Sequence, residues 1–176
     1  MNSKKYRNKI KLSIAFWLVL ISHICIGQNV IEYINKLEHE DPQVRFKAIW
    51  KLIDIKNTCA VFPLIKSLND QDQRVRNSSA YALGSIGDKR AVEFLIEKLD
   101  SDIGSNAAEA LGKIGDIRAF EPLLEKLHGN FGSSIIEALG EIGDRRAIEH
   151  LVPFLKHKTW YVRNDAFDVL NKLGWI

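Results

Sequence analysis

A seven-residue phrase occurs three times in this chain, at intervals of 28 residues. It reads Ala-Leu-Gly-x-Ile-Gly-Asp at residues 82–88, 110–116 and 138–144. Self-similarity at a fixed period of about 20–50 residues is the signature of a stacked repeat protein. Such a chain builds a long surface from copies of one small unit and typically uses that surface for binding. The repeat therefore constrains the architecture strongly, but it does not identify the partner.

Apolar residues in each copy recur at helical spacing. Val44, Ala48, Leu52 and Ile55 form one stripe, as expected of a helix with a single buried face. Residues 91–99 show the same spacing after the first copy of the phrase. Each repeat is thus predicted to contain a helix A, in which the phrase lies, and a helix B that follows it.

The junction between the two helices is predicted from cap chemistry. Each phrase ends in a Gly-Asp pair, at residues 87–88, 115–116 and 143–144. The glycine suits the left-handed residue after a helix, and the aspartate can accept hydrogen bonds from the free N–H groups of helix B. A further glycine lies inside helix A at Gly84, Gly112 and Gly140. Its recurrence predicts that a neighbouring helix passes too close for a side chain, so these residues are interpreted as structural and not catalytic.

The whole pattern predicts an all-α chain of ten helices. A lone B helix is expected over residues 29–38 and a final A helix over residues 160–173. Between them lie four A–B pairs, which are predicted to begin near Asp41, Asp72, Asp102 and Phe131. The repeat spacing is 31, 28, 28 and 31 residues, because two units lose three residues in the turn from B to A. The units at the two ends are atypical, as capping repeats are.

The first 27 residues are interpreted as a signal peptide. Residues 1–11 carry five basic side chains and no acid, residues 12–26 are mostly apolar, and Cys25 and Gly27 are small residues before Gln28. This order of segments is typical of secretory signals. The repeat domain is then residues 28–176, secreted or periplasmic and without membrane contact after cleavage. An uncleaved N-terminal anchor is the alternative, although the apolar run is shorter than the ~20 residues that span a bilayer.

Removal of this segment changes the charge of the chain. The 25 basic residues fall to 20 against 22 acidic ones, so the net charge becomes −2. A basic surface for nucleic acid is therefore not expected. Only Cys59 would remain of the two cysteines, so no disulfide is expected within the processed chain, and Cys59 is predicted to be a small buried apolar residue.

The extended pattern resembles a known repeat. Asp-x-x-Val-Arg, Ala-Leu-Gly-x-Ile-Gly-Asp and x-Arg-Ala are similar to the HEAT-like repeat of phycobilin lyases, over nearly all of residues 29–174. The resemblance implies a right-handed α-α superhelix. Proteins with this repeat include bilin lyase subunits, an iron hydroxylase and many scaffolds. The resemblance therefore implies a fold more than a function. Gly104 and Gly132 depart from it, because an arginine is expected there.

Candidate catalytic chemistry is sparse. The four histidines after residue 27 are His39, His128, His150 and His157. No two of them share a metal-ligand spacing on one helix, and no phosphate-binding loop follows a strand. We therefore expect no metal, no cofactor and no enzymatic activity. The alternative, by analogy with the bilin lyases, is an accessory subunit of a lyase or isomerase, or of a cofactor-handling system.

One candidate partner surface lies on the first A helix. Phe46, Trp50 and Ile53 fall on the side opposite the core stripe. In later repeats the position of Trp50 is occupied by Tyr81, Glu109, Glu137 and Asp168. Phe46, Trp50 and Tyr81 are thus a predicted docking patch. The alternative is that these aromatic residues cover the open N-terminal end of the stack.

A second candidate surface lies on the B helices. Glu93, Glu97, Glu121 and Glu125 recur on the face away from the core. An arginine three residues before Glu93 and Glu121 predicts ion pairs within each helix. An acidic row on the concave side would favour a basic peptide and repel nucleic acid; a solvated, internally paired face is the alternative. The sequence as a whole predicts an exported, non-enzymatic scaffold for an unidentified protein or peptide, and it leaves the oligomeric state open.

Overall fold

The structure is a computed structural model that describes residues 30–175, which fold entirely into helices and turns without a strand. The A helices are α3 (Pro42–Ile55), α5 (Gln73–Ile86), α7 (Gly104–Ile114), α9 (Gly132–Ile142) and α11 (Trp160–Lys172). The B helices are α2 (Val30–Lys36), α4 (Val61–Ser67), α6 (Val92–Ile96), α8 (Phe120–Lys126) and α10 (Ala147–Leu151). The ten predicted helices are therefore confirmed.

Short 3-10 segments accompany the B helices, which the repeat pattern did not predict. They are η1 (Thr58–Ala60), η2 (Lys89–Ala91), η3 (Ile117–Ala119) and η4 (Val152–Lys156). The first three precede α4, α6 and α8, whereas η4 follows α10. Four of the five B helices thus have a tighter turn at one end, and α2 is the exception.

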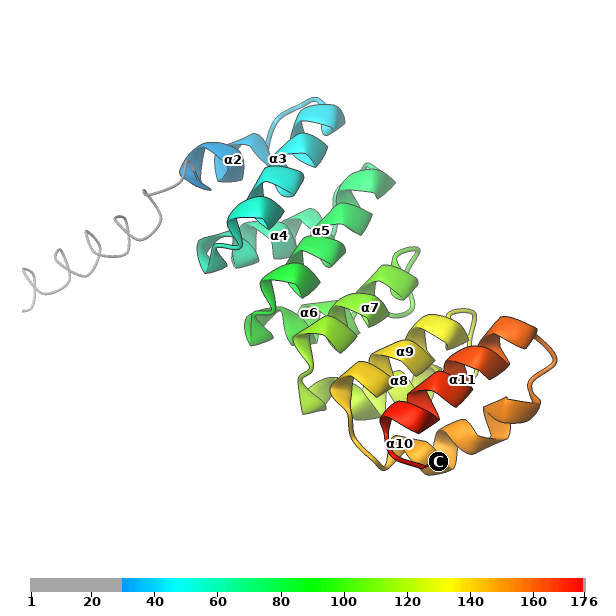
Figure 1. Ribbon diagram of the computed structural model, residues 1–176. Helices are drawn as coiled ribbons and strands as arrows, with labels where there is room; N and C mark the ends of the chain where they lie inside the picture. Colours follow the sequence, from blue (N-terminus) through cyan, green and yellow to red (C-terminus); the bar gives the residue numbers. More distant parts are fainter. Residues whose placement is uncertain (1–29, 176) are drawn as a thin grey trace, which may run out of the picture.

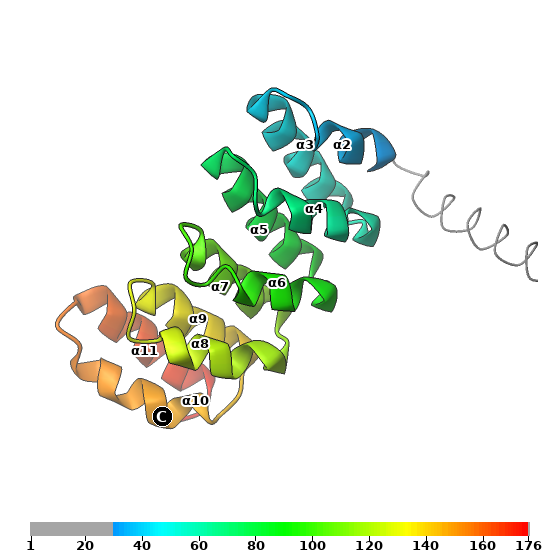
Figure 2. The same ribbon diagram turned by 180° about the vertical axis from the view of Figure 1, so that it is seen from behind.

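The helices form two layers of a solenoid. The A helices lie side by side on one face and the B helices on the other (Figures 1 and 2). Each B helix packs against the A helix that follows it, and consecutive A helices pack against each other. We call each B helix with its following A helix a tier, so the described residues build five stacked tiers.

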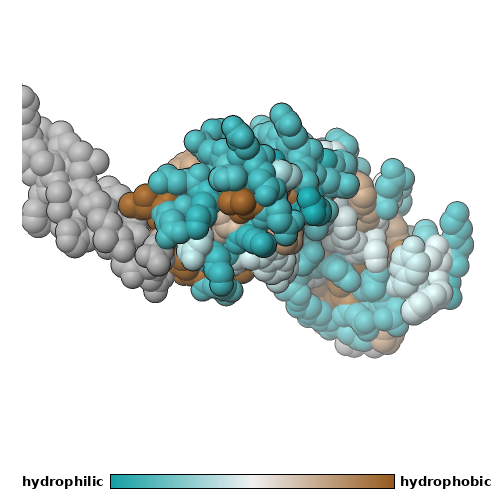
Figure 3. All heavy atoms as spheres, turned by 90° about the horizontal axis from the view of Figure 1, so that it is seen from above, coloured by the Kyte–Doolittle hydropathy of each residue, from teal (hydrophilic) through white to brown (hydrophobic). Residues whose placement is uncertain are grey.

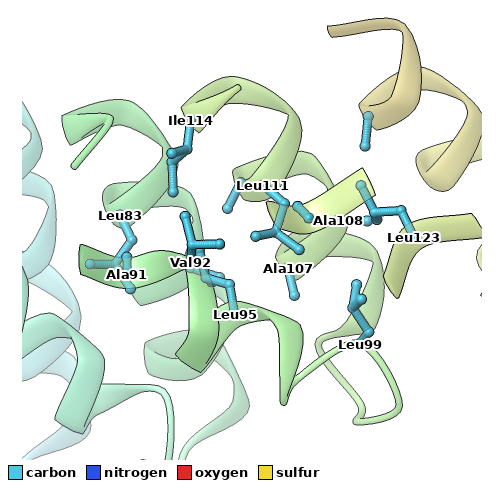
Figure 4. Packing of buried hydrophobic residues seen from close by; sticks show 14 of the residues in the cluster. Leu83, Ala91, Val92, Leu95, Leu99, Ala107, Ala108, Leu111, Ile114 and Leu123 are labelled. Atoms are coloured by element: carbon cyan, nitrogen blue, oxygen red, sulfur yellow. The ribbon is translucent and has the colours of Figure 1, made fainter. Parts of the chain in front are cut away.

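One continuous hydrophobic core runs through the stack. Its centre is formed by leucine, valine and alanine side chains of α5, α6, α7 and α8, which interdigitate between neighbouring tiers (Figure 4). In the predicted stripe of α3, Ala48 and Leu52 are buried, while Val44 and Ile55 at its ends are half-buried. Burial of this apolar surface between tiers is the main stabilising term of the fold.

The Gly-Asp junctions have the predicted geometry. Gly87, Gly115 and Gly143 close their A helices with φ between 66° and 78°. The aspartate after each glycine accepts a hydrogen bond from the backbone N–H two residues later, at 2.9, 3.1 and 2.9 Å. The same hinge is thus repeated at one edge of the solenoid.

The glycines inside the A helices are also explained by packing. A Cβ atom on Gly84 would lie 2.8 Å from Cα of Ala110 in the next A helix, and one on Gly112 would lie 2.8 Å from Cα of Ala138. On Gly140 it would lie 2.7 Å from a methyl group of Val169. The predicted close approach of neighbouring helices is therefore confirmed.

The two glycines that replace arginine have a different cause. A Cβ atom on Gly104 would lie 2.4 Å from the carbonyl oxygen of Leu99 and 2.4 Å from Cε2 of Phe131. On Gly132 it would lie 3.2 Å from the carbonyl oxygen of Leu127. The shortened turn brings the end of the B helix against the start of the A helix, and this excludes a side chain at Gly104.

Cys59 differs from its predicted role as a simple buried apolar residue. It is half-buried against the core and is disulfide-bonded. The chain contains one other cysteine, Cys25, which lies outside the described residues.

The predicted signal peptide over residues 1–27 also lies outside the described residues. Among residues 30–175, no helix is long and apolar enough to cross a bilayer.

Candidate partner-binding surfaces

The outward row of the A helices begins with stacked aromatic rings. Trp50 of α3 and Tyr81 of α5 are 44% and 36% exposed, and their ring centroids lie 5.8 Å apart. Phe46 meets Trp50 edge to face at 6.1 Å. The structure therefore brings the three predicted aromatic residues together across two tiers.

Phe46 has a different environment from the other two. It is half-buried and packs against the hydrophobic core. Ile53, which was expected on the same outward side, is half-buried in the same way. The accessible part of the aromatic cluster is thus Trp50 and Tyr81.

A lysine ammonium group extends the aromatic row toward the middle of the stack. Nζ of Lys113 lies 4.2 Å from the centroid of the Tyr81 ring. The same Nζ donates a hydrogen bond of 2.5 Å to Glu109, which occupies the Trp50 position of α7. An aromatic face and a carboxylate therefore hold a cation between them on this surface.

The C-terminal part of the row is acidic. Burial raises the pKa of Glu137, and the nearby carboxylates of Asp165, Glu109 and Glu141 raise it further. Asp168, the last member of the row, accepts a hydrogen bond of 3.0 Å from Asn164. Three carboxylates and no cation act on the pKa of Glu137 besides burial, so negative charge gathers here.

The count of charged groups supports the same conclusion. The carboxylates on this part of the A-helix face are Glu109, Glu137, Glu141, Asp165 and Asp168, and the lysines are Lys113 and Lys172. Five carboxylates stand against two lysines, which leaves an excess of three negative charges. We call the row Trp50, Tyr81, Glu109, Glu137 and Asp168 the A-face row.

The B-helix face carries ion pairs that link tiers, which corrects the pairing expected within each helix. Arg118 contacts Glu93 of the preceding tier at 3.1 Å, and Arg146 contacts Glu121 at 3.1 Å. In the α4 tier the position of Glu93 is occupied by Phe62, and the guanidinium of Arg90 lies 5.2 Å from the centroid of that ring. The arginines of the last three tiers thus reach back onto the tier before them.

The other two predicted acids of the B face are placed differently. Glu97 and Glu125 are exposed, and within residues 30–175 neither forms an ion pair. The predicted B-face set therefore divides into Glu93 and Glu121, which arginines compensate, and Glu97 and Glu125, which remain accessible.

A groove of about 1300 Å³ was not predicted. It lies between the end of α2, helix α4 and the turns that follow them, and Phe62, Lys66 and Glu38 are among its lining residues. The ion pair of Arg45 with Asp70, at 2.7 Å, also lines it. The long turn after Leu68 and the exposed Phe62 were the signals that could have indicated it.

Three of the four histidines after residue 27 make structural contacts. Nδ1 of His39 and Nδ1 of His157 each accept a hydrogen bond from the backbone N–H two residues later, at 3.0 and 3.2 Å. His128 and His157 stack on the ring of Phe154, with centroids at 5.3 and 6.0 Å. No cluster of three metal-ligating side chains occurs among residues 30–175.

Solved structures with the same architecture include both natural and designed proteins. The complex of CpcE and CpcF of phycocyanin lyase from Nostoc sp. PCC7120 contains a chain 28% identical to this one, with a TM-score of 0.75. The match covers 82% of this chain and 64% of that one, so this chain spans less than two thirds of the lyase chain.

Two designed proteins share the fold at lower identity. An engineered protein is 22% identical with a TM-score of 0.62, over 82% of this chain and 79% of that one. A designed armadillo repeat protein in complex with the peptide (KR)4 is 17% identical with a TM-score of 0.59, over 93% and 94%. No curated protein sequence matches the chain significantly.

Two repeat families cover most of the described residues. The family of HEAT repeats matches residues 32–105, and the PBS lyase HEAT-like repeat matches residues 105–129 and 133–157. These matches agree with the tiers, the Gly-Asp hinges and the close helix contacts described above. The chain is a HEAT-like repeat protein.

Proposed function

We propose that the chain is a non-enzymatic scaffold that binds a cationic peptide segment across the A-face row. The observation that carries this proposal is the row itself. One outward side chain per tier changes from aromatic at Trp50 and Tyr81 to acidic at Glu109, Glu137 and Asp168. A segment with a flat or aliphatic end and several lysines or arginines complements such a surface.

The contacts of Lys113 support a cationic partner. Its ammonium group lies against Tyr81 and binds Glu109, so the surface already holds one lysine in the arrangement that a partner would use. Trp50 is the neighbouring exposed ring and has no cation over it among the described residues. A partner lysine or arginine placed over Trp50 would repeat this contact one tier earlier.

The B face supports binding less well. Arg118 and Arg146 already compensate Glu93 and Glu121. Glu97, Glu125 and the exposed Glu149 of α10 remain for a cationic ligand there. We therefore place the main contact on the A face, and the B-face glutamates serve as the matched control.

The proposal is tested with an alternating lysine-arginine octapeptide, the sequence bound by the designed armadillo protein. Fluorescence anisotropy at low salt would measure its affinity. Glu137→Gln with Asp168→Asn should weaken binding by about tenfold, because two carboxylates of the row are lost. Glu97→Gln with Glu125→Gln removes the same charge from the B face and should change the affinity by less than about twofold.

Two results would contradict the proposal. Equal losses in both charge variants would mean that the peptide responds only to net charge. Unchanged binding after Trp50→Ser with Tyr81→Ser would remove the aromatic end from the surface.

The affinity should also depend on pH through Glu137. Its raised pKa means that the side chain is neutral at acidic pH and becomes ionised as the pH rises through that pKa. A cationic peptide binds the ionised form better, so the affinity should rise with pH and then level off. Glu137→Gln should remove this step from a titration, while Glu97→Gln should leave it unchanged.

The second candidate function is an accessory subunit of a lyase, and the likeness to the phycocyanin lyase complex favours it. The test is whether the purified chain binds a bilin, followed by its visible absorption. Stoichiometric binding of the chromophore would replace the scaffold proposal.

We further propose that the chain is exported and cut before Gln28. The support is the order of basic, apolar and small residues in residues 1–27. N-terminal sequencing of the native protein should begin at Gln28, and mass analysis should then find Cys59 as the one cysteine present. An N-terminus upstream of Gln28 would contradict this cleavage. A native disulfide between Cys59 and Cys25, the other cysteine of the chain, would contradict it as well.

A further inference from the structure

The outer side of α11 exposes a residue that every other tier buries. Phe167 is 46% exposed. The same position in the four preceding A helices is occupied by Ile49, Ala80, Ala108 and Ile136, each with 0% exposure. In those tiers the next A helix packs over the position. Within residues 30–175, no helix covers Phe167 in this way.

The arginine at the start of α11 lacks a contact that its counterparts make. Arg45 donates to two backbone carbonyls of its own turn and to Asp70 of the next turn. Arg76 follows the same pattern with Asp102. Arg163 donates to the carbonyls of His157 and Lys158 but has no carboxylate partner among the described residues.

A row of alternating charge ends at the same place. Lys113, Glu141 and Lys172 occupy one position on α7, α9 and α11, and Lys172 Nζ lies 2.6 Å from Glu141. The next member of this row should be an acid. The same position on α3, the first A helix, is Asp54, which is 71% exposed.

We infer that the outer side of α11 binds the α2–α3 end of a second copy of this chain, so that the solenoid continues from one copy into the next. All three features point to this occupant. Extending the repeat by one tier places Asp54 of the second copy against Lys172. It also places the turn over residues 38–41 against Arg163. In this turn Glu38 binds Lys66 and Asp41 caps α3, so Glu40 is the carboxylate left for Arg163.

The apolar part of the contact is smaller than the ionic part. Lys47 and Lys51 are exposed on the α3 side that would face Phe167, and their aliphatic stems can cover its ring. Figure 3 looks down on the end that carries α2 and α3 and shows a mostly hydrophilic surface with a few separate hydrophobic patches. The contact is therefore salt-sensitive and weaker than the contacts between tiers of one chain.

The two ends differ from each other, so the contact is head to tail and does not close by itself. Such a heterologous contact gives open chains of copies or, if the rotation allows, a ring. This distinguishes it from a symmetric dimer of two α11 faces, which would leave Asp54 unused.

Charge reversal tests the inference. Sedimentation velocity of the purified chain at low salt should show a mean mass that rises with concentration and falls with added salt. Lys172→Glu or Asp54→Lys alone should weaken self-association by about tenfold, because like charges then face each other. An equimolar mixture of the two variants should recover self-association. The unchanged α11 side of the Asp54→Lys variant fits the unchanged α3 side of the Lys172→Glu variant, and the two reversed sides carry opposite charges.

Phe62→Ser on the B face is the matched control for exposed apolar surface and should not change self-association, whereas Phe167→Ser should reduce it. Circular dichroism verifies that each variant remains folded. A monomer at every concentration would overturn the inference. So would a self-association that Lys172→Glu abolishes and Asp54→Lys leaves intact, because that result indicates the symmetric contact.

Discussion

The two kinds of turn between B and A helices give the solenoid two different edges. At the long turn between α4 and α5, Arg45 of the preceding A helix binds Asp70 with two hydrogen bonds of 2.7 Å. At the short turn between α6 and α7, Gly104 stands in the arginine position and the backbone of Leu99 lies against it. Turn length therefore decides whether the A helix after the turn begins with an arginine. Arg76, after the long turn, reaches Asp102 of the next tier, whereas Gly104, after the short turn, has no side chain to do so.

The largest effect is expected for Gly104→Ala. A methyl group there would lie 2.4 Å from the Leu99 carbonyl oxygen, and a backbone atom cannot move aside without shifting the turn. We expect a loss of about 3 kcal/mol or more in the free energy of unfolding, at the upper end of overpacking effects. Urea denaturation followed by circular dichroism measures it.

Gly104→Arg sharpens the same point, because it restores the residue typical of the repeat. If turn length governs this position, the restored arginine should destabilise the protein at least as much as alanine does. A stabilised Gly104→Arg variant would show that an arginine fits after a short turn, and the comparison of the two edges would fail.

The next effect is expected for Arg45→Ala at the long turn. The side chains of Arg45 and Asp70 are only 13% and 11% exposed, so removing the guanidinium leaves a carboxylate that is poorly solvated. A loss of about 2–3 kcal/mol is expected, below the range for fully buried pairs. Arg76→Ala should cost about 1 kcal/mol, because Asp102 is 45% exposed and can be hydrated. Equal losses would mean that burial of the pair does not matter.

The opposite edge should not distinguish the two kinds of tier, because the Gly-Asp hinge is the same in both. Asp116→Ala removes a cap and the contact with Arg118, with an expected loss of about 1–2 kcal/mol. Asp88→Ala should cost a similar amount, since Asp88 caps its helix and binds Arg90 in the same way. A clear difference between them would extend the turn effect to this edge.

The hinge also predicts a pH dependence. The hydrogen bonds that Asp116 accepts from the Arg118 side chain and backbone hold the pKa of Asp116 below its usual value. Its contribution to stability is present above the unfolded-state pKa of about 4 and is lost as the pH falls toward the folded-state pKa. Between neutral pH and pH 3, wild type should therefore lose more stability than Asp116→Ala, which unfolding curves at the two pH values would measure.

Much of this fold could be predicted, because the residues that determine it lie close together within one copy of the repeat. Helix number, the Gly-Asp hinges and the close approach at Gly84 follow from spacing and cap chemistry within one copy. The partner of Arg118 could not be predicted, since Glu121 lies three residues away in its own helix whereas the glutamate it contacts is Glu93 of the previous tier. Spacing along one helix does not reveal how far a long side chain reaches across a tier.

The candidate surfaces show the same division. The change from Trp50 to Asp168 along one row could be predicted by aligning the copies. The half-burial of Phe46 and the contact of Lys113 with Tyr81 could not, because both depend on how far each tier turns relative to the next. The groove beside Phe62 depends on the path of two turns, for which the repeat pattern has no signal.

The smallest effect is expected for Gly132→Ala, which tests whether both short turns act alike. A Cβ atom there would lie 3.2 Å from the Leu127 carbonyl oxygen, so a shift of a few tenths of an ångström would accommodate it. Alanine also restricts the unfolded chain more than glycine does, which contributes about 0.4–1 kcal/mol in favour of the folded state. These terms nearly cancel, so the net change should be within about 0.5 kcal/mol of zero. A loss as large as that of Gly104→Ala would mean that the shortened turn itself excludes a side chain, whereas a small change would assign the effect at Gly104 to the 2.4 Å approaches of Leu99 and Phe131.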